Sequence, residues 1–304
     1  MSSQDKKHDA KRTGRKSIAV ETLRVIKASS YTLNGITHDL SASLQAAELN
    51  TQFYAVNSIL RDWKAAQSPS PSQSKTEFSF HEISTLQGAR LLSTVSPTSR
   101  IGILNFASAK KPGGGFLTGA QAQEESIARS STLYPTLISQ QARQYYELHK
   151  KHPRGGFYSD SMIFSPGIVV FRDDKGELVE PLNVDVVTSP AVNAGVVRKT
   201  LLGQFEPAET EEKIAKAMRE RMGRILYLFE QQGVKNVVLG SFGTGVFKNK
   251  VDLVGRVWAE YLSIPGARFE KSFERVVFAI LGEETFRDFQ AAYQVVVNKV
   301  PTSG

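Results

Sequence analysis

Residues 100–126 read RIGILNFASAKKPGGGFLTGAQAQEES, and three kinds of segment follow one another within them. The apolar run at 100–106 predicts a buried strand, and residues 121–130 have the apolar spacing of a helix. Between them stand three consecutive glycines, Gly113–Gly115. Because each glycine makes a segment harder to order on folding, a simple surface turn rarely contains three. A loop that must lie close to a ligand does need them, so this stretch predicts a strand, a ligand-contacting loop and a helix.

Outside this stretch the sequence continues to alternate between strand-like and helical segments. Further strands are expected at residues 77–83, 162–171, 184–189, 236–240 and 275–281. Further helices are expected at residues 17–28, 40–56, 86–95, 138–150, 209–232, 250–262 and 284–295. Such alternation predicts an α/β fold with a mainly parallel central sheet and helices on both faces. Ligands of these sheets bind outside the carboxyl ends of the strands, where the glycine loop is expected.

The amino-terminal part gives three further expectations. Residues 1–16 are polar and basic and predict a disordered tail, after which Ser17 is a candidate N-cap for the first helix. Residues 31–39 predict a hairpin with Asn34-Gly35 at its turn. The stretch QSPSPSQSK at 67–75 predicts a flexible surface loop inserted within one domain of residues 17–299.

Composition narrows the classes of protein. The chain has 304 residues, 40% of them hydrophobic, which is enough for a full core, and no cysteine. Disulfides, thiolate zinc sites, iron–sulfur clusters and a cysteine nucleophile are therefore excluded. No apolar run approaches the roughly 18–20 residues of a membrane span. We expect an intracellular protein, in the nucleus, the cytoplasm or both if the source is eukaryotic.

Positive charge is concentrated at the amino terminus. Residues 1–16 contain six lysines and arginines and two aspartates. Their net charge of +4 (6 − 2) is half of the formal net charge of +8. A tail of this kind can bind nucleic acid, but a solvated tail is the preferred interpretation. The remaining positive charge suits an anionic ligand without requiring one.

A second glycine loop follows another predicted strand. In VVLGSFGTGVFKN at 237–249, Gly240, Gly243 and Gly245 lie between a strand and a helix. Backbone N–H groups of such a loop can hold a phosphate, although a tight strand–helix turn explains the pattern equally well. The loop is not a P-loop, because no Gly-Lys-Ser/Thr follows, and it lies too late in the sheet for the usual dinucleotide fingerprint.

The motif Gln123-Glu124-Glu125 supplies two adjacent carboxylates close to the first glycine loop. Burial and mutual repulsion are expected to raise the pKa of at least one of them, which suits a general acid. Because neighbouring residues point in different directions, the two are expected to have different roles. The alternative is that both acids merely begin a helix, where the helix dipole favours negative charge.

Other residues are weaker candidates. His149 and His152 have a loose metal spacing, but a solvated basic helix end is the preferred interpretation. Trp63 and Trp258 are expected to pack in the core, and Tyr145-Tyr146 to lie half in the core and half at the surface. No cluster of metal-ligating residues is evident, so neither a metal nor another cofactor is expected.

The combination of motifs resembles the signature of poly(ADP-ribose) glycohydrolases of the compact type found in bacteria and filamentous fungi. The resemblance rests on NFASA at 105–109, on GGG at 113–115 and, seven residues later, on QEE at 123–125. It extends to residues 15–22, to VDVVTSPAVN at 184–193 and to GSFGTGVFKN at 240–249. It implies a three-layer α/β/α macrodomain with a mixed, mainly parallel sheet, an amino-terminal helical extension, and ADP-ribose bound across the strand ends. The Ser/Pro insertion is not part of the family core.

The resemblance also implies roles for individual residues. Glu125 is expected to be the catalytic acid, while Glu124 and Asn105 are expected to hold hydroxyls of the ribose at the scissile bond. Phe247 is expected to press that ribose toward Glu125. Further substrate contacts are expected from Gly113, Gly114, Gly115 and Gln123 and, around the diphosphate, from Gly243, Thr244, Gly245 and Val246. The signature does not place the adenine-binding residues.

We therefore expect an enzyme that hydrolyses ribose–ribose bonds of poly(ADP-ribose), mainly from the chain end, and releases ADP-ribose. Its expected partners are the polymer, the ADP-ribose product and poly(ADP-ribosyl)ated proteins. One alternative is a macrodomain hydrolase that acts on mono-ADP-ribosylated protein or on other ADP-ribose derivatives. Another is a macrodomain that binds ADP-ribose without catalysis, although mere binding does not need an acid at Glu125.

Overall fold

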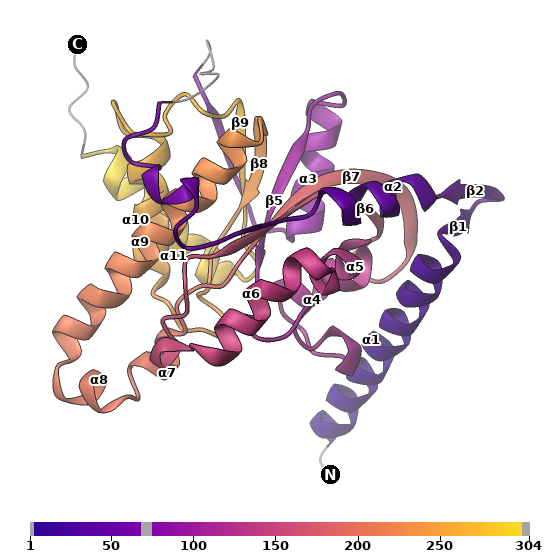
Figure 1. Ribbon diagram of the computed structural model, residues 1–304, viewed down its shortest axis with the longest axis horizontal. Coiled ribbons are helices and arrows are strands. Elements are labelled where there is room, and N and C mark those ends of the chain that lie inside the picture. Colours follow the sequence, from indigo (N-terminus) through magenta and orange to yellow (C-terminus); the bar gives the residue numbers. More distant parts are fainter. Residues whose placement is uncertain (1–2, 68–74, 300–304) are drawn as a thin grey trace.

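A seven-stranded sheet forms the centre of the computed structural model, which describes residues 3–67 and 75–299 (Figure 1). All but two residues of the predicted Ser/Pro loop lie outside the described residues. Neighbouring strands are β3 (Gln52–Tyr54), β6 (Met162–Arg172), β7 (Leu178–Ser189), β5 (Ile101–Phe106), β8 (Asn236–Leu239), β9 (Arg275–Ala279) and β4 (Glu77–His81), in this order. Pairing is parallel from β7 to β4 and antiparallel between β3, β6 and β7. The prediction of a mixed, mainly parallel sheet is confirmed.

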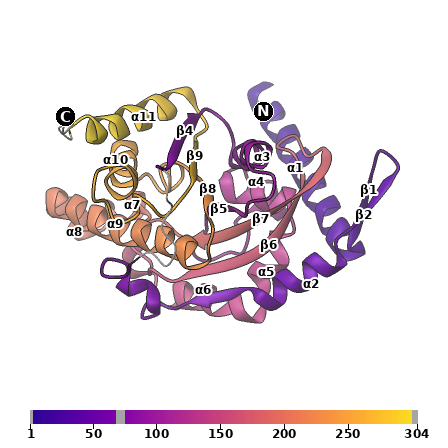
Figure 2. The same cartoon turned by 90° about the horizontal axis from the view of Figure 1, so that it is seen from above.

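Two hydrophobic cores cover the two faces of the sheet, because successive strand residues point to opposite sides. On β5, Leu104 packs into one core and Ile103 into the other. The first core lies under α9 (Pro207–Gln231), α10 (Val251–Leu262) and α11 (Glu283–Val297). The second lies under α3 (Thr85–Val95), α4 (Gln123–Ser130), α5 (Leu133–Ile138) and α6 (Gln140–Lys151). Figure 2 shows these two groups of helices on either side of the sheet, so the three-layer arrangement is confirmed.

The predicted helix at 40–56 is too long. Helix α2 ends at Asn50 (Ser41–Asn50), and β3 begins two residues later. A tertiary contact explains why the helix ends early, because Phe53 pairs with Ile163 of β6 at the edge of the sheet. The predicted hairpin is confirmed: β1 (Ser30–Leu33) and β2 (Ile36–Asp39) are joined by Asn34 and Gly35, both with positive φ.

The first helix is longer than expected and corrects the interpretation of residues 1–16. Helix α1 (Ser3–Ala28) includes most of the predicted disordered tail, and Ser17 lies inside the helix instead of capping it. Contacts with a distant turn explain the difference. Nε of Arg12 donates to the carbonyl of Thr118 (3.0 Å) and Nε of Arg15 to that of Gly119 (2.8 Å). A tail that is solvated in isolation is thus held by partners more than a hundred residues away.

The carboxyl ends of β5 and β8 bring the two glycine loops together. Residues 107–122 connect β5 to α4 and include the short 3-10 helix η2 (Phe116–Thr118), while residues 240–250 connect β8 to α10. Short helices that the sequence did not predict, α7 (Ala194–Val197) and α8 (Leu201–Phe205), lie between β7 and α9. Among the described residues, no helix has the length and apolar character needed to cross a membrane.

Candidate active site

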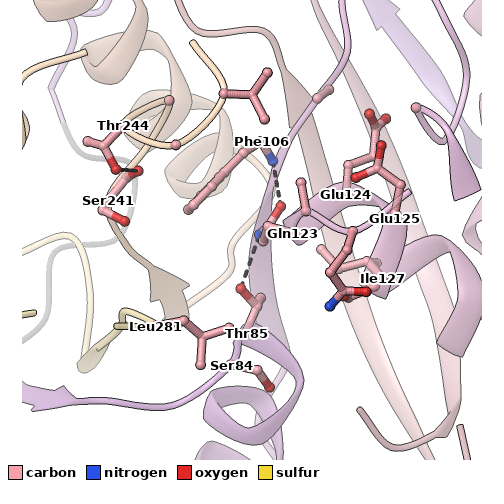
Figure 3. A pocket seen from close by; sticks show the side chains of 18 of the residues that line it. Ser84, Thr85, Phe106, Gln123, Glu124, Glu125, Ile127, Ser241, Thr244 and Leu281 are labelled. Carbon is pink, nitrogen blue, oxygen red and sulfur yellow. Dashed lines mark hydrogen bonds between the residues drawn. The ribbon is translucent and has the colours of Figure 1, made fainter. Parts of the chain in front are cut away.

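A cavity of about 960 Å³ opens where the two glycine loops meet, outside the carboxyl ends of the parallel strands. One wall carries Gly114, Glu124 and Glu125, and the opposite wall carries residues 243–248. The cavity continues to the first turn of α3 and to Leu281, so the two predicted ligand-contacting loops share one site (Figure 3). Its size is typical of a site for a small molecule.

The first glycine loop is shaped by contact with the carboxylates. Gly113 and Gly114 have φ values of +66° and +60°, a region that other residues rarely adopt. A β-carbon on Gly114 would lie 2.3 Å from Oε1 of Glu125 and 3.0 Å from Oε2 of Glu124. Gly114 therefore leaves room for both carboxyl groups at once.

Glu125 is fixed by the backbone of this loop. The N–H of Gly115 donates a hydrogen bond of 2.8 Å to its Oε1, while Oε2 accepts none from the described residues. The side chain is only 9% exposed but lines the cavity. One oxygen of Glu125 is thus anchored and the other is available to a ligand.

Glu124 is buried beside it. Its Oε2 accepts a 2.7 Å hydrogen bond from the N–H of Ser108, whereas Oε1 is buried without a hydrogen-bond partner in the structure. Burial, with a smaller contribution from the charge of Glu125, raises the pKa of Glu124 to about 8, against the opposing effect of the hydrogen bond from Ser108. The prediction that at least one of the two pKa values is raised is confirmed. The expectation of divergent side chains is wrong, because each carboxylate turns one oxygen to the same glycine.

Asn105, at the end of β5, lies behind this wall and does not itself line the cavity. Its side chain is fully buried, and Nδ2 donates to Oγ1 of Thr188 (3.2 Å), while Oδ1 has no partner in the structure. Buried polar atoms without partners are uncommon in folded proteins. Two such oxygens, Oδ1 of Asn105 and Oε1 of Glu124, belong to neighbouring side chains here. They suit a ligand with hydroxyl groups.

The second glycine loop is closed on itself by Asn249. Nδ2 of this buried side chain donates to the carbonyls of Val192 (2.7 Å) and Gly243 (3.0 Å). Gly243 has a φ of +74°, and a β-carbon on it would lie 2.2 Å from that of Ala191. Gly245, in contrast, has open space around it, and Val246 is 74% exposed. The loop holds a rigid turn at Gly243 and presents an open backbone at Gly245.

Comparison with known proteins agrees with this geometry. Residues 19–173 match the family model of the microbial-type PARG catalytic domain, which is half of the chain. The chain belongs to the microbial-type poly(ADP-ribose) glycohydrolase family. It is 34% identical to the poly(ADP-ribose) glycohydrolase of Thermomonospora curvata, over 93% of this chain and 98% of that one, with a TM-score of 0.82.

Two ligand complexes are also similar. The Thermomonospora curvata enzyme bound to the inhibitor ADP-HPD is 35% identical, over 92% of this chain and 98% of that one, with a TM-score of 0.79. The poly(ADP-ribose) glycohydrolase of Deinococcus radiodurans in complex with ADP-ribose is 33% identical, over 88% and 98%, with a TM-score of 0.72. No curated protein matches the chain.

Within this glycohydrolase site, Gln123 lines the cavity and also has a structural role that we did not predict. Its Oε1 accepts from the N–H of Phe106 (2.8 Å), and its Nε2 donates to Oγ1 of Thr85 (3.0 Å) and to the carbonyl of Leu104 (2.6 Å). Both amide hydrogens are therefore used inside the protein. Figure 3 shows the bonds that join Gln123 to Thr85 and Phe106. Gln123 ties the start of α4 to β5 and so positions the two glutamates that follow it.

Phe247 lies in the second loop as expected and lines the cavity. Its ring packs against the first hydrophobic core and lies 6.0 Å from that of Tyr158, which has a φ of +58°. Sequence reasoning missed Tyr158, and it also missed Ser108 and Arg129. The buried guanidinium of Arg129 donates to the carbonyl of Ala120 (2.6 Å) and so braces the segment before α4. Ser108 lies in the motif NFASA but was assigned no role, and no local pattern distinguishes Tyr158 or Arg129.

The burial of their side chains shows which expectations hold for the histidines, tyrosines and tryptophans named above. A solvated helix end is the wrong interpretation for His149, which is fully buried and whose Nε2 accepts from the N–H of Ser159 (3.1 Å). His152 is exposed, as that interpretation predicted. Burial lowers the pKa of His149 to about 4. Tyr145 and Tyr146 are both buried instead of half exposed, and the expected core positions of Trp63 and Trp258 are confirmed. Within the described residues, no group of three or more acidic or histidine side chains could hold a metal.

Proposed function

We propose that this glycohydrolase cleaves the ribose–ribose O-glycosidic bond of poly(ADP-ribose) with Glu125 as both acid and base. The observation that carries the proposal is the hydrogen bond from the Gly115 N–H to Oε1 of Glu125. It holds one carboxyl oxygen against the glycine loop and leaves the other toward the cavity, next to the unpartnered oxygens of Asn105 and Glu124. A proton donor on the cavity wall thus lies beside two buried oxygens that can accept from hydroxyl groups.

The proposed reaction has two steps. Protonated Glu125 gives its proton to the bridging oxygen as the bond from that oxygen to the anomeric carbon breaks, which leaves an oxocarbenium-like ribose and a free hydroxyl on the remaining polymer. Glu125, now ionised, takes a proton from a water molecule as the water oxygen attacks the anomeric carbon. The products are ADP-ribose and a polymer that is one unit shorter, and Glu125 is protonated again.

The positions of the acids support a single acid–base residue. Glycosidases with two catalytic carboxylates hold them on opposite sides of the sugar, about 5–10 Å apart. Here Glu124 and Glu125 meet the same side of Gly114. The third acidic residue among the described residues that line the cavity is Asp174, which accepts a 2.6 Å hydrogen bond from Ser84 at the far end. Glu124 is assigned to the ribose hydroxyls together with Asn105.

The shape of the cavity gives an orientation for ADP-ribose. The diphosphate is assigned to the space between residues 114–115 and residues 243–247, where the backbone approaches from both sides. Leu281, Ser84 and Thr85 lie at the end away from the glutamates, which leaves that end for the adenosine (Figure 3). Phe247 is assigned to the ribose at the scissile bond.

Incubation with labelled poly(ADP-ribose), followed by chromatography of the products, tests the proposal. We expect ADP-ribose as the main early product while long chains shorten gradually. Early appearance of mid-length fragments would contradict cleavage from the chain end. Release of ADP-ribose only from mono-ADP-ribosylated protein would favour the related hydrolase activity, and tight binding without any product would favour a non-catalytic binding protein. The same assay on automodified protein tests whether poly(ADP-ribosyl)ated proteins are substrates.

A further inference from the structure

Five basic residues surround the loop that holds Glu125, and we call them the basic rim: Lys11, Arg12, Lys16, Lys110 and Lys111. All five are exposed. Lys110 and Lys111 immediately precede the glycine loop, and Lys111 lines the cavity. The other three belong to α1, which passes beside α4 (Figure 1). Basic residues that are about a hundred positions apart in the sequence therefore contribute positive charge to one region.

Helix α1 sits directly on the turn that follows the glycine loop. A β-carbon on Gly119 would lie 2.3 Å from the carbonyl oxygen of Arg12, 3.0 Å from its Cγ and 3.1 Å from Cγ of Lys16. The carbonyl of Gly115 accepts hydrogen bonds from the N–H groups of Thr118 and Ala120, so this turn is joined to the residue that anchors Glu125. The basic face of α1 is thus fixed relative to the catalytic carboxylate.

The charges of the basic rim are not neutralised inside the protein. Within the described part of the chain, no residue of the basic rim forms an ion pair with a carboxylate. Glu21, an acidic residue of α1, instead pairs with Arg172 on β6 (3.6 Å). Spacing of four residues also places Arg12 and Lys16 on one side of the helix. Several cations therefore face solvent together, beside the cavity.

We propose that the basic rim binds the part of the polymer beyond the scissile bond, through the diphosphate groups of its next units. This inference rests on the proposed function, which places the terminal unit in the cavity and its outgoing bond at Glu125. The rest of the polymer must leave past the loop that anchors Glu125, and each further unit carries a diphosphate. Cations on both sides of that loop attract the polymer over about 8 Å at physiological salt.

Nucleic acid carries the same phosphate chemistry, but the position of the basic rim favours the polymer. Lys111 joins the rim to the cavity, so one polymer can occupy both at once and gain from the second contact without a second binding event. A nucleic acid would meet the rim alone.

The test compares two substrates in the full chain. One is long poly(ADP-ribose), and the other is a single ADP-ribose unit with an uncharged aromatic leaving group on its anomeric carbon. The variant is K11E/K16E, in which Glu keeps the β- and γ-carbons of Lys16 that lie on Gly119. The matched control is K27E/K271E, with the same change of charge at the last turn of α1 and before β9.

At low salt we expect kcat/KM for long polymer to fall about tenfold in K11E/K16E. The slope of log kcat/KM against log salt concentration is expected to become shallower by ~1.4, because each of the two lost phosphate contacts contributes ~0.7. Turnover of the single-unit substrate and both activities of the control variant are expected to stay at wild-type values. An equal fall with both substrates would mean that α1 only supports the loop, and this result, like an unchanged kcat/KM for polymer, would overturn the proposal.

Binding in an E125Q background separates the basic rim from the proposed catalysis. There, K11E/K16E is expected to weaken binding of long polymer about tenfold at low salt and to leave binding of ADP-ribose unchanged. This result supports the basic rim even if the wild-type chain proves unable to cleave polymer, which would refute the proposed function alone. Tighter binding of single-stranded DNA with an equal number of phosphates, lost in K11E/K16E, would identify a nucleic-acid surface and overturn the proposal.

Discussion

Gly114 and Glu125 are in direct contact: a β-carbon on the glycine would come within 2.3 Å of the carboxyl oxygen Oε1. The same oxygen accepts the hydrogen bond of the Gly115 N–H. The middle glycine of the triplet and the last residue of QEE are therefore fitted to one another. The need for a glycine here comes from the position of the Glu125 carboxylate.

Glu125→Gln is expected to lower kcat by roughly 10²–10⁴, because glutamine cannot give a proton to the leaving oxygen. The affinity for ADP-ribose, measured by calorimetry, is expected to survive, since glutamine can still accept the hydrogen bond from Gly115. Glu147→Gln on the exposed surface of α6 is the matched control. A Glu125→Gln enzyme within tenfold of wild type would refute the assignment of the acid.

Gly114→Ala is expected to lower kcat by on the order of a hundredfold, because the new methyl group pushes the Glu125 carboxylate away from its working position. The positive φ of Gly114 adds backbone strain. Gly14→Ala is the control, since Gly14 lies inside α1 with nothing within 4 Å of an added β-carbon. Thermal unfolding shows whether each variant is folded, and normal turnover by folded Gly114→Ala would show that the contact does not matter.

Gly243→Ala and Gly245→Ala are expected to differ in their affinity for ADP-ribose. Gly243→Ala creates a 2.2 Å contact with Ala191 and strains a φ of +74°, so we expect about tenfold weaker binding. Gly245→Ala meets no protein atom within 4 Å, so it leaves the loop unstrained and should weaken binding less than Gly243→Ala does. Calorimetry measures the affinity of the two variants for ADP-ribose. Equal affinities would mean that the turn at Gly243 does not shape the diphosphate site.

Glu124 is expected to make the fold less stable as pH rises. Its folded pKa of about 8 lies above the ordinary 4.5, so the folded state keeps a proton that the unfolded state has lost between these values. The contribution of this group to the free energy of unfolding therefore falls from about pH 4.5 to about pH 8. Glu124→Gln removes this loss, so its Tm relative to wild type should rise across the same range. A Tm difference that does not change with pH would contradict the raised pKa.

Phe247→Ala is expected to reduce kcat more than ADP-ribose affinity. The ring lines the cavity and is backed by Tyr158, so its loss lets the ribose move relative to Glu125. A displacement of about 1 Å can lower the rate on the order of a hundredfold. Phe205→Ala is the control, because Phe205 on α8 is 80% exposed. If both kinetic parameters of Phe247→Ala match wild type, Phe247 is only a core residue.

Much of this protein could be predicted from short segments of its sequence. The apolar run of β5, the alternation of strands and helices and the Asn34-Gly35 turn are local patterns, and the structure contains all three. The distance in sequence between the glycine triplet and QEE is equally local, and it brings both to one loop and the helix after it. Local patterns succeed here because backbone geometry and side-chain periodicity act over a few residues.

Tertiary contacts decided what those patterns left open. Residues 3–16 became helical because Arg12 and Arg15 reach carbonyls more than a hundred residues away. The raised pKa of Glu124 depends on burial. The unexpected role of Gln123 depends on its hydrogen bonds to Thr85 and β5. The closed turn at Gly243 depends on contacts with Asn249 and Ala191. Burial and hydrogen bonding depend on which distant segments meet. For that reason the sequence alone indicated the two glycine loops and the QEE motif, whereas packing determined which of their residues line the cavity and how each is held.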